Sequence, residues 1–156
     1  MTHPPARARL PVLLFAGAAL IGSACLAQSG SGVSLVGKAT LPFACQGVAV
    51  QGDYAYVTMD GGLGEGTAWV AIINVADPAG PYQEGFYVPG GSFHPTRIQV
   101  DGTRAYVGST RPDLRVLDVT DPTSPQLAAQ YEEYAQDVEL SGGYLYLAAL
   151  TEGLVI

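Results

Sequence analysis

The chain has 156 residues, of which 48% are apolar and only 13% are charged, against about 25% charged in ordinary soluble domains. This composition, with 20 glycines and 11 prolines, excludes a coiled coil and a charge-rich disordered chain. The net charge of −7 excludes a basic nucleic-acid binder, because an acidic surface repels phosphate backbones and anionic lipid headgroups. We therefore expect no nucleic-acid partner.

The first 27 residues have the order of a secretory signal peptide. Arg7 and Arg9 come first without any acidic residue, an almost entirely apolar run spans residues 10–27, and small residues cluster at its end. We expect cleavage after Ala27 and an exported protein that is secreted, periplasmic or on the cell surface. A retained anchor is the alternative, because the apolar run is at the lower limit for spanning a bilayer.

The cleavage site decides the fate of Cys25. Residues Gly22 to Cys25 resemble the lipobox of bacterial lipoproteins at Ser23 and Ala24, although Gly22 stands where that pattern usually has Leu. Cleavage before Cys25 would leave this cysteine available for lipidation, whereas plain secretion discards it. We expect contact with a membrane only if Cys25 is lipidated or the signal segment is retained. For Cys45 we expect a small buried residue rather than a reactive thiol.

Residues 28–36 are predicted to be a flexible linker, because they begin with the run Gln-Ser-Gly-Ser-Gly. The rest of the chain repeats. Three segments share a pattern of alternating apolar residues, a glycine and an alternating run with tyrosine. They are Val48-Ala-Val-Gln-Gly-Asp-Tyr-Ala-Tyr-Val57, Ile98-Gln-Val-Asp-Gly-Thr-Arg-Ala-Tyr-Val107 and Val138-Glu-Leu-Ser-Gly-Gly-Tyr-Leu-Tyr-Leu147. A second set follows them, which is Val70-Ala-Ile-Ile-Asn-Val-Ala-Asp-Pro78, Leu114-Arg-Val-Leu-Asp-Val-Thr-Asp-Pro122 and Leu154-Val-Ile156.

The spacing between copies shows where the first copy is longer. The glycine of the pattern recurs after 50 residues from Gly52 to Gly102, but after 40 residues from Gly102 to Gly142. The difference divides into an insertion of six residues before Asp77 and an insertion of four residues after it. We place the first insertion between the second and third strands, and the other between the fourth strand and the next first strand.

Each unit is predicted to be a four-stranded antiparallel meander. Its apolar runs are short and alternate with period two, which is typical of strands. A hairpin turn is expected around Gly52, the Asp-Pro pairs end the third strand, and residues 82–88 and 126–131 supply the fourth strand. Four such strands in about 40 residues make a β-propeller blade. We therefore predict an all-β fold with blades at 37–84 and 85–130, and a truncated blade at 131–156.

The runs Gly-Asp-Tyr-Ala-Tyr-Val, Ile-Ile-Asn-Val-Ala-Asp-Pro and Gly-Leu-Val-Ile resemble the LVIVD repeat family of bacterial and archaeal surface or secreted proteins. The resemblance covers residues 37–156 and implies a β-propeller, but no common activity and no catalytic residues. Propellers typically close with four to eight blades, so two full blades and part of a third form an incomplete ring. We expect a fragment of a longer protein whose remaining blades close the ring; closure by identical chains is the alternative.

Both insertions are expected on the same rim of the propeller, because alternate connections of a meander emerge on one side of the sheet. Variable loops on one face of a rigid scaffold are the usual location of binding sites. The candidate binding residues near this rim are Asp60, Glu65, Trp69, His94, Arg97, Arg111 and Asp137. No catalytic residue, metal site or cofactor is predicted.

Several of these residues also have a simpler interpretation. Asp60 and Glu65 are expected to be solvated loop carboxylates, because the spacing of an EF-hand is missing. Core packing is favoured for Trp69 and a solvated charge for Arg111. His94 is expected to be an exposed loop histidine, since no other histidine follows the signal segment to build a metal cluster with it.

Arg97 and Asp137 occupy equivalent positions just before the first strand of their units, near the mouth of the central channel. We therefore expect them to pair between neighbouring blades. The leading interpretation of the whole chain is a non-catalytic exported scaffold that binds a protein or a cell-envelope component through the decorated rim.

Two other functions stay open, because the fold alone does not choose among them. One is a propeller enzyme, a hydrolase, lyase or quinone-dependent oxidoreductase, with its active site in missing blades. The other is a carbohydrate-binding propeller that uses Trp69 and loop tyrosines.

Overall fold

The structure is a computed structural model that describes residues 34–61 and 68–156. The predicted signal segment, Cys25 and Glu65 lie outside the described residues. Residues 35–156 form one unit, and the description concerns that unit. Within the part of the chain that is described, no helix is long and apolar enough to cross a membrane.

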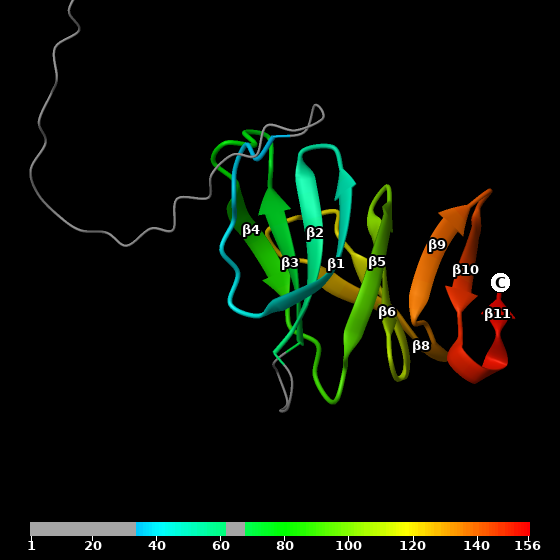
Figure 1. The fold of residues 1–156 in the computed structure, drawn as a ribbon. Coiled ribbons are helices and arrows are strands. Elements are labelled where there is room, and N and C mark those ends of the chain that lie inside the picture. The colour runs from blue at the N-terminus through cyan, green and yellow to red at the C-terminus, as the bar shows by residue number, and fades with distance from the viewer. Residues whose placement is uncertain (1–33, 62–67) are drawn as a thin grey trace, which may run out of the picture. The chain divides into compact units, whose positions relative to one another are not determined.

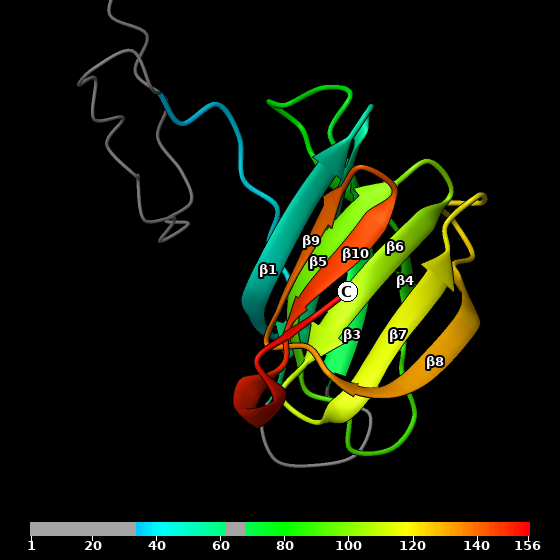
Figure 2. The same cartoon turned by 90° about the vertical axis from the view of Figure 1, so that its right-hand side faces the viewer.

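The unit is built from three antiparallel β-sheets that follow one another along the chain (Figures 1 and 2). The first has the order β1-β2-β3-β4, with strands Ala44–Gln51, Tyr54–Asp60, Ala68–Asn74 and Tyr82–Tyr87. The second has the order β5-β6-β7-β8, with strands Pro95–Asp101, Arg104–Ser109, Pro112–Asp118 and Gln126–Tyr134. The third contains β9 (Asp137–Ser141), β10 (Tyr144–Ala148) and β11 (Leu154–Val155), with a 3-10 turn, η1 (Leu150–Glu152), before β11. The predicted all-β fold with four-stranded antiparallel units is confirmed.

The same tight hairpin joins the first two strands of every sheet. Gln51 pairs with Tyr54, so only two residues form the loop, and the repeats at Asp101 and Ser141 pair in the same register. The first loop residue is a glycine each time, with a φ of 59°, 57° and 61°. Side chains disfavour this left-handed conformation, which explains why the glycine recurs in the pattern.

Hydrophobic residues fill the space between neighbouring sheets. The first and second sheets share a core that contains Tyr56, Val70, Ile72, Ile98, Ala105, Val107, Leu117 and Val119. A smaller core between the second and third sheets contains Leu114, Ala135, Val138 and Leu147. Because successive residues of a strand point to opposite faces, a strand covered on both faces is buried at consecutive positions. In β7 this holds for residues 114–117, so the second sheet is covered on both faces.

Asp118 fastens the end of the third strand of the second sheet. Its Oδ1 accepts a hydrogen bond from the Thr120 amide at 2.9 Å, and its other oxygen pairs with Arg104, which lies opposite on β6. Hydrogen bonds from Thr120 and then from Arg104 lower the pKa of Asp118 from 3.8 to about 2. The Asp118 carboxylate therefore stabilises the fold fully at pH values above its ordinary pKa of 3.8. This contribution is lost as the pH falls through the pKa of Asp118 in the folded chain, about 2.

We expect Asp118→Asn to make unfolding less dependent on pH in this window. The parent should lose more of its free energy of unfolding than the variant between about pH 5 and about pH 2, because only the parent must protonate Asp118. Urea unfolding of both chains at the two pH values measures the difference. An equal loss in the two chains would contradict the assignment.

Candidate binding rim

One end of the unit gathers the connections that the two insertions lengthen. β2 and β6 end there and β5 and β9 begin there, at the lower side of Figure 1. We call this end the insertion rim; its described residues are 44–47, 60–61, 88–97, 109–112 and 135–137. The hairpin loops at Gly52, Gly102 and Gly142 lie at the opposite end, since an antiparallel meander alternates its connections.

Asp60 and His94 join the two lengthened connections. Asp60 is the last residue of β2, His94 comes just before β5, and Asp60 Oδ2 lies 3.0 Å from His94 Nδ1. Both side chains are partly buried, so the expectation of a solvated loop carboxylate is wrong for Asp60, because β2 extends to this residue and His94 covers it. The backbone carbonyl of His94 also accepts a hydrogen bond from the Thr110 amide.

Arg115 anchors the second insertion, and the sequence analysis did not single it out. The Arg115 side chain is 8% exposed; its Nε and Nη2 each donate to Asp113 at 2.9 Å, and its Nη2 also donates to the Gly90 carbonyl at 3.1 Å. It lies 4.4 Å from the centre of the Phe93 ring. The sequence feature that could have indicated this role is an arginine within the apolar run Leu-Arg-Val-Leu, with Asp113 two residues earlier on the same strand face.

The charge of Arg115 is secured by its surroundings. Burial acts to lower its pKa, but the hydrogen bonds and attraction of Asp113 outweigh burial, so the pKa rises above its ordinary value. Because Gly90 and Phe93 belong to the connection from β4 to β5, the contacts of Arg115 with these two residues hold this connection against the second sheet.

Trp69 packs among aromatic rings on the face of the first sheet that points away from the second sheet. Its ring stacks on Phe86, with centroids 4.8 Å apart and an interplanar angle of 13°. Phe43 meets it edge to face at 5.4 Å. Together with Met59 and Ile73 on this face, these contacts fix Trp69 in a hydrophobic cluster.

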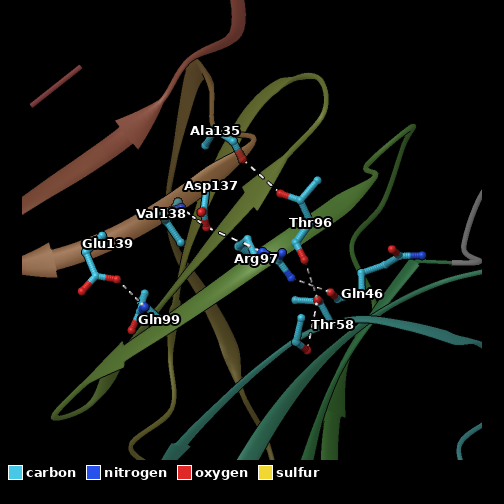
Figure 3. A network of polar contacts seen from close by, with 10 residues as sticks. Gln46, Thr58, Thr96, Arg97, Gln99, Ala135, Asp137, Val138 and Glu139 are labelled. Atoms are coloured by element: carbon cyan, nitrogen blue, oxygen red, sulfur yellow. Dashed lines mark hydrogen bonds and ion pairs between the residues drawn. The ribbon is translucent and has the colours of Figure 1, made fainter. Parts of the chain in front are cut away.

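The first strands of the three sheets lie side by side and form a polar seam (Figure 3). Arg97 Nε lies 3.7 Å from Asp137 Oδ1, the pairing between neighbouring repeats that their equivalent positions predicted. Arg97 Nη1 also donates to the Gln46 carbonyl at 3.2 Å. Two residues further along, Gln99 Nε2 donates to Glu139 Oε2 at 2.9 Å, again between equivalent positions of neighbouring repeats.

Threonine hydroxyls extend the seam toward the sheet interior. Thr58 Oγ1 donates to the Thr96 carbonyl at 3.2 Å, and Thr96 Oγ1 donates to the Ala135 carbonyl at 3.0 Å (Figure 3). At the opposite end, the Gln51 amide exchanges two hydrogen bonds with the backbone of Gly102. Side chains of one repeat thus satisfy backbone groups of the next.

The seam opens at the insertion rim into a cavity of about 360 Å³. Its lining is polar and comes from the start of the first strand of each repeat, with Gln46 from the first, Thr96 and Arg97 from the second, and Gln136 and Asp137 from the third. Arg97 and Asp137 are more than half exposed, so both charges face solvent. The cavity therefore offers amide, hydroxyl, cationic and anionic groups together.

Arg111 and Cys45 also lie on the insertion rim. Arg111 is exposed in the connection from β6 to β7, as a solvated charge would be. Cys45 is exposed, so the expectation that it is buried is wrong. Cys45 is the second residue of β1, the first strand of the first sheet, and no other sheet of the described residues covers it.

The described residues contain no group of three or more His, Cys, Asp or Glu side chains that could hold a metal ion. Among the same residues, every buried side-chain nitrogen or oxygen has a hydrogen-bond partner. The insertion rim is a polar surface, and its own ion pairs and hydrogen bonds hold that surface in place.

The match of the sequence to a known protein family agrees with the three-sheet arrangement. A family model described as the LVIVD repeat matches residues 44–87, 94–133 and 132–156, which correspond to the three sheets. No curated protein matches the chain.

Proposed function

The chain belongs to the LVIVD repeat family, and from this premise we propose that it is a non-catalytic, exported propeller-type scaffold. It binds a protein or a component of the cell envelope through the insertion rim. The family match carries the propeller-type fold, while the partner, the export and the use of this rim are our proposals.

One observation carries the choice of rim. The ends of the two lengthened connections meet at the contact of Asp60 with His94, 3.0 Å apart. The described ends of the two connections therefore lie at the same end of the sheets. Arg115 holds the second connection in place, so part of this surface is ordered before a partner arrives, which reduces the entropic cost of binding.

The polar cavity at the centre of the rim suits a polar partner. Arg97 and Asp137 present opposite charges to solvent at its edge, within a chain whose net charge is −7. Opposite charges placed close together favour a partner that carries a matching pair of charges, because complementary charges steer association and fix its register.

The proposal is tested by sedimentation of the chain with the envelope fraction of the cells that produce it. We expect the parent to bind and Asp137→Lys to reduce its affinity by about tenfold, since one charge of the exposed Arg97–Asp137 pair is then reversed. Asp53→Lys is the matched control, because Asp53 is also exposed but lies in a hairpin loop at the opposite end. No binding by the parent, or equal losses in the two variants, would overturn the proposal.

A further inference from the structure

The ion pair at the polar cavity differs from the other arginine–aspartate pairs of the described residues. Arg104 and Arg115 each contact their aspartate within hydrogen-bond distance. In contrast, Arg97 Nε lies 3.7 Å from Asp137 Oδ1, which is beyond a hydrogen bond, and the two side chains are 58% and 64% exposed. Opposite charges in this setting attract only weakly, so the pair contributes little to the stability of the fold.

Each charged group of this pair is held in position by the backbone. Arg97 Nη1 donates to the Gln46 carbonyl at 3.2 Å, and Asp137 Oδ1 accepts a hydrogen bond from the Val138 amide at 3.0 Å (Figure 3). Within the residues that the structure describes, Arg97 Nη2 and Asp137 Oδ2 make no hydrogen bond. The cavity is thus lined by two fixed, oppositely charged side chains, each with an unused hydrogen-bonding atom.

A glycine makes room for this arrangement. Gly47 is the residue of the first repeat that is equivalent to Arg97 and Asp137. A Cβ added to Gly47 would lie 2.7 Å from the Thr96 carbonyl oxygen and 3.1 Å from the Arg97 Cα, so something would have to shift. A side chain at Gly47 would push the first sheet away from the second and weaken the contact of Arg97 with Gln46. The glycine therefore helps to keep the guanidinium at the cavity.

Two side-chain amides complete the set of unused groups. Gln46 and Gln136 are equivalent residues of the first and third repeats, and both are exposed at the cavity. In the described part of the chain, neither side-chain amide has a hydrogen-bond partner. Each amide offers two donors and one acceptor. The cavity therefore adds neutral hydrogen-bonding groups to the two charges.

The two charges select among classes of ligand. A simple anion that is attracted by Arg97 would be repelled by Asp137, and a simple cation would meet the reverse. A group that carries both charges avoids this repulsion, because its carboxylate can pair with the guanidinium while its ammonium pairs with the carboxylate of Asp137. In an α-amino acid a single carbon separates the two charged groups, so both can reach charges that lie this close together.

The size of the cavity agrees with a small ligand group. Its volume of about 360 Å³ is near the lower end of the range for small-molecule sites, about 300–1,000 Å³. The cavity can therefore enclose one amino-acid group but not a folded domain.

We propose that this cavity binds a zwitterionic α-amino-acid group. The ligand carboxylate accepts a hydrogen bond from Arg97 Nη2, and the ligand ammonium donates to Asp137 Oδ2. The four charges then alternate in sign around a ring, so each lies between two opposite charges. Such a group occurs in a free amino acid and on an envelope polymer that carries an amino acid with both groups free. The inference rests on the proposed use of the insertion rim and names the chemistry recognised there.

Titrations of the ¹⁵N-labelled full chain, followed by NMR, test the class of ligand. L-alanine is the probe, L-alaninamide keeps only its positive charge, and N-acetyl-L-alanine keeps only its negative charge. We expect L-alanine to shift the backbone signals of Gln46, Arg97 and Asp137 with a dissociation constant on the order of 1 mM. Each analogue should bind at least about tenfold more weakly, because it leaves one charge of the pair unmatched. Equal binding by either analogue, or no saturable shift with L-alanine, would overturn the inference.

Variants of the two charged residues test which groups bind. Arg97→Gln and Asp137→Asn should each weaken the binding of L-alanine by about tenfold. Arg104→Gln is the matched control and should leave binding unchanged, because Arg104 also belongs to a solvent-accessible ion pair but lies at the hairpin end of the second sheet. Amide signals away from the cavity report whether each variant is folded. Equal losses in all three variants would contradict the assignment.

Competition distinguishes the sources of the ligand and separates this inference from the proposed function. L-alanine is added to the sedimentation assay with the envelope fraction. Release of the chain by L-alanine would support an envelope-borne amino-acid group, whereas binding of L-alanine without envelope binding would support a free amino acid. Envelope binding by a chain whose signals L-alanine does not shift would leave the proposed function standing and overturn this inference.

Discussion

Replacement of Asp113 by alanine is expected to lower the free energy of unfolding by about 3–5 kcal/mol, because it leaves a buried guanidinium without its counter-ion. Arg115 donates two hydrogen bonds to this carboxylate, and both side chains are largely shielded from water. The contact with Phe93 would remain, but it cannot replace a full negative charge. Urea unfolding of the variant beside the parent measures the loss.

A double replacement separates the ion pair from simple packing. Asp113→Ala combined with Arg115→Met removes both charges and keeps an apolar side chain in place, so most of the lost stability should return. Equal losses in the single and double variants would mean that the carboxylate matters for its shape. A loss below about 1 kcal/mol in the single variant would mean that the pair is effectively solvated.

Leu117→Ala is expected to cost about 2–5 kcal/mol, the range for removing a large aliphatic side chain from a core. Leu117 has no exposed surface and lies in the core shared by the first and second sheets. The truncation would leave a cavity between two sheets, which the surrounding strands cannot fill without breaking their hydrogen bonds. Denaturant unfolding gives the change in free energy directly.

Leu127→Ala is the matched control for this prediction. Leu127 pairs with Leu117 on the neighbouring strand β8, but it is 43% exposed, so the same truncation should cost less than about 1 kcal/mol. If both variants lose the same stability, the second sheet does not pack against the first through the face that carries Leu117.

The sequence was sufficient for the features that recur in every repeat. The glycine of each hairpin, the period-two alternation and the Asp-Pro turns are local signals, and each acts within a few residues. The pairing of Arg97 with Asp137 could also be predicted, because a regular repeat places equivalent positions of neighbouring units next to each other.

The features that the sequence analysis missed depend on contacts between distant residues. Asp60 and His94 are 34 residues apart, and nothing in their spacing indicates that one covers the other. Cys45 was expected to be buried because a free cysteine behaves as a small apolar residue, yet it is exposed near the start of the first strand of the first sheet. Arg115 lies in a strand whose apolar neighbours predict burial, and only the fold shows what neutralises its charge.

Consecutive repeats pack face to face as blades and so create one rim. The most direct test is a nuclear Overhauser spectrum of the methyl-labelled chain. It should show cross-peaks between the methyl groups of Val70 and Ile72 in the first sheet and those of Val107 and Leu117 in the second, which share one core. Cross-peaks confined to residues of the same sheet would contradict the claim.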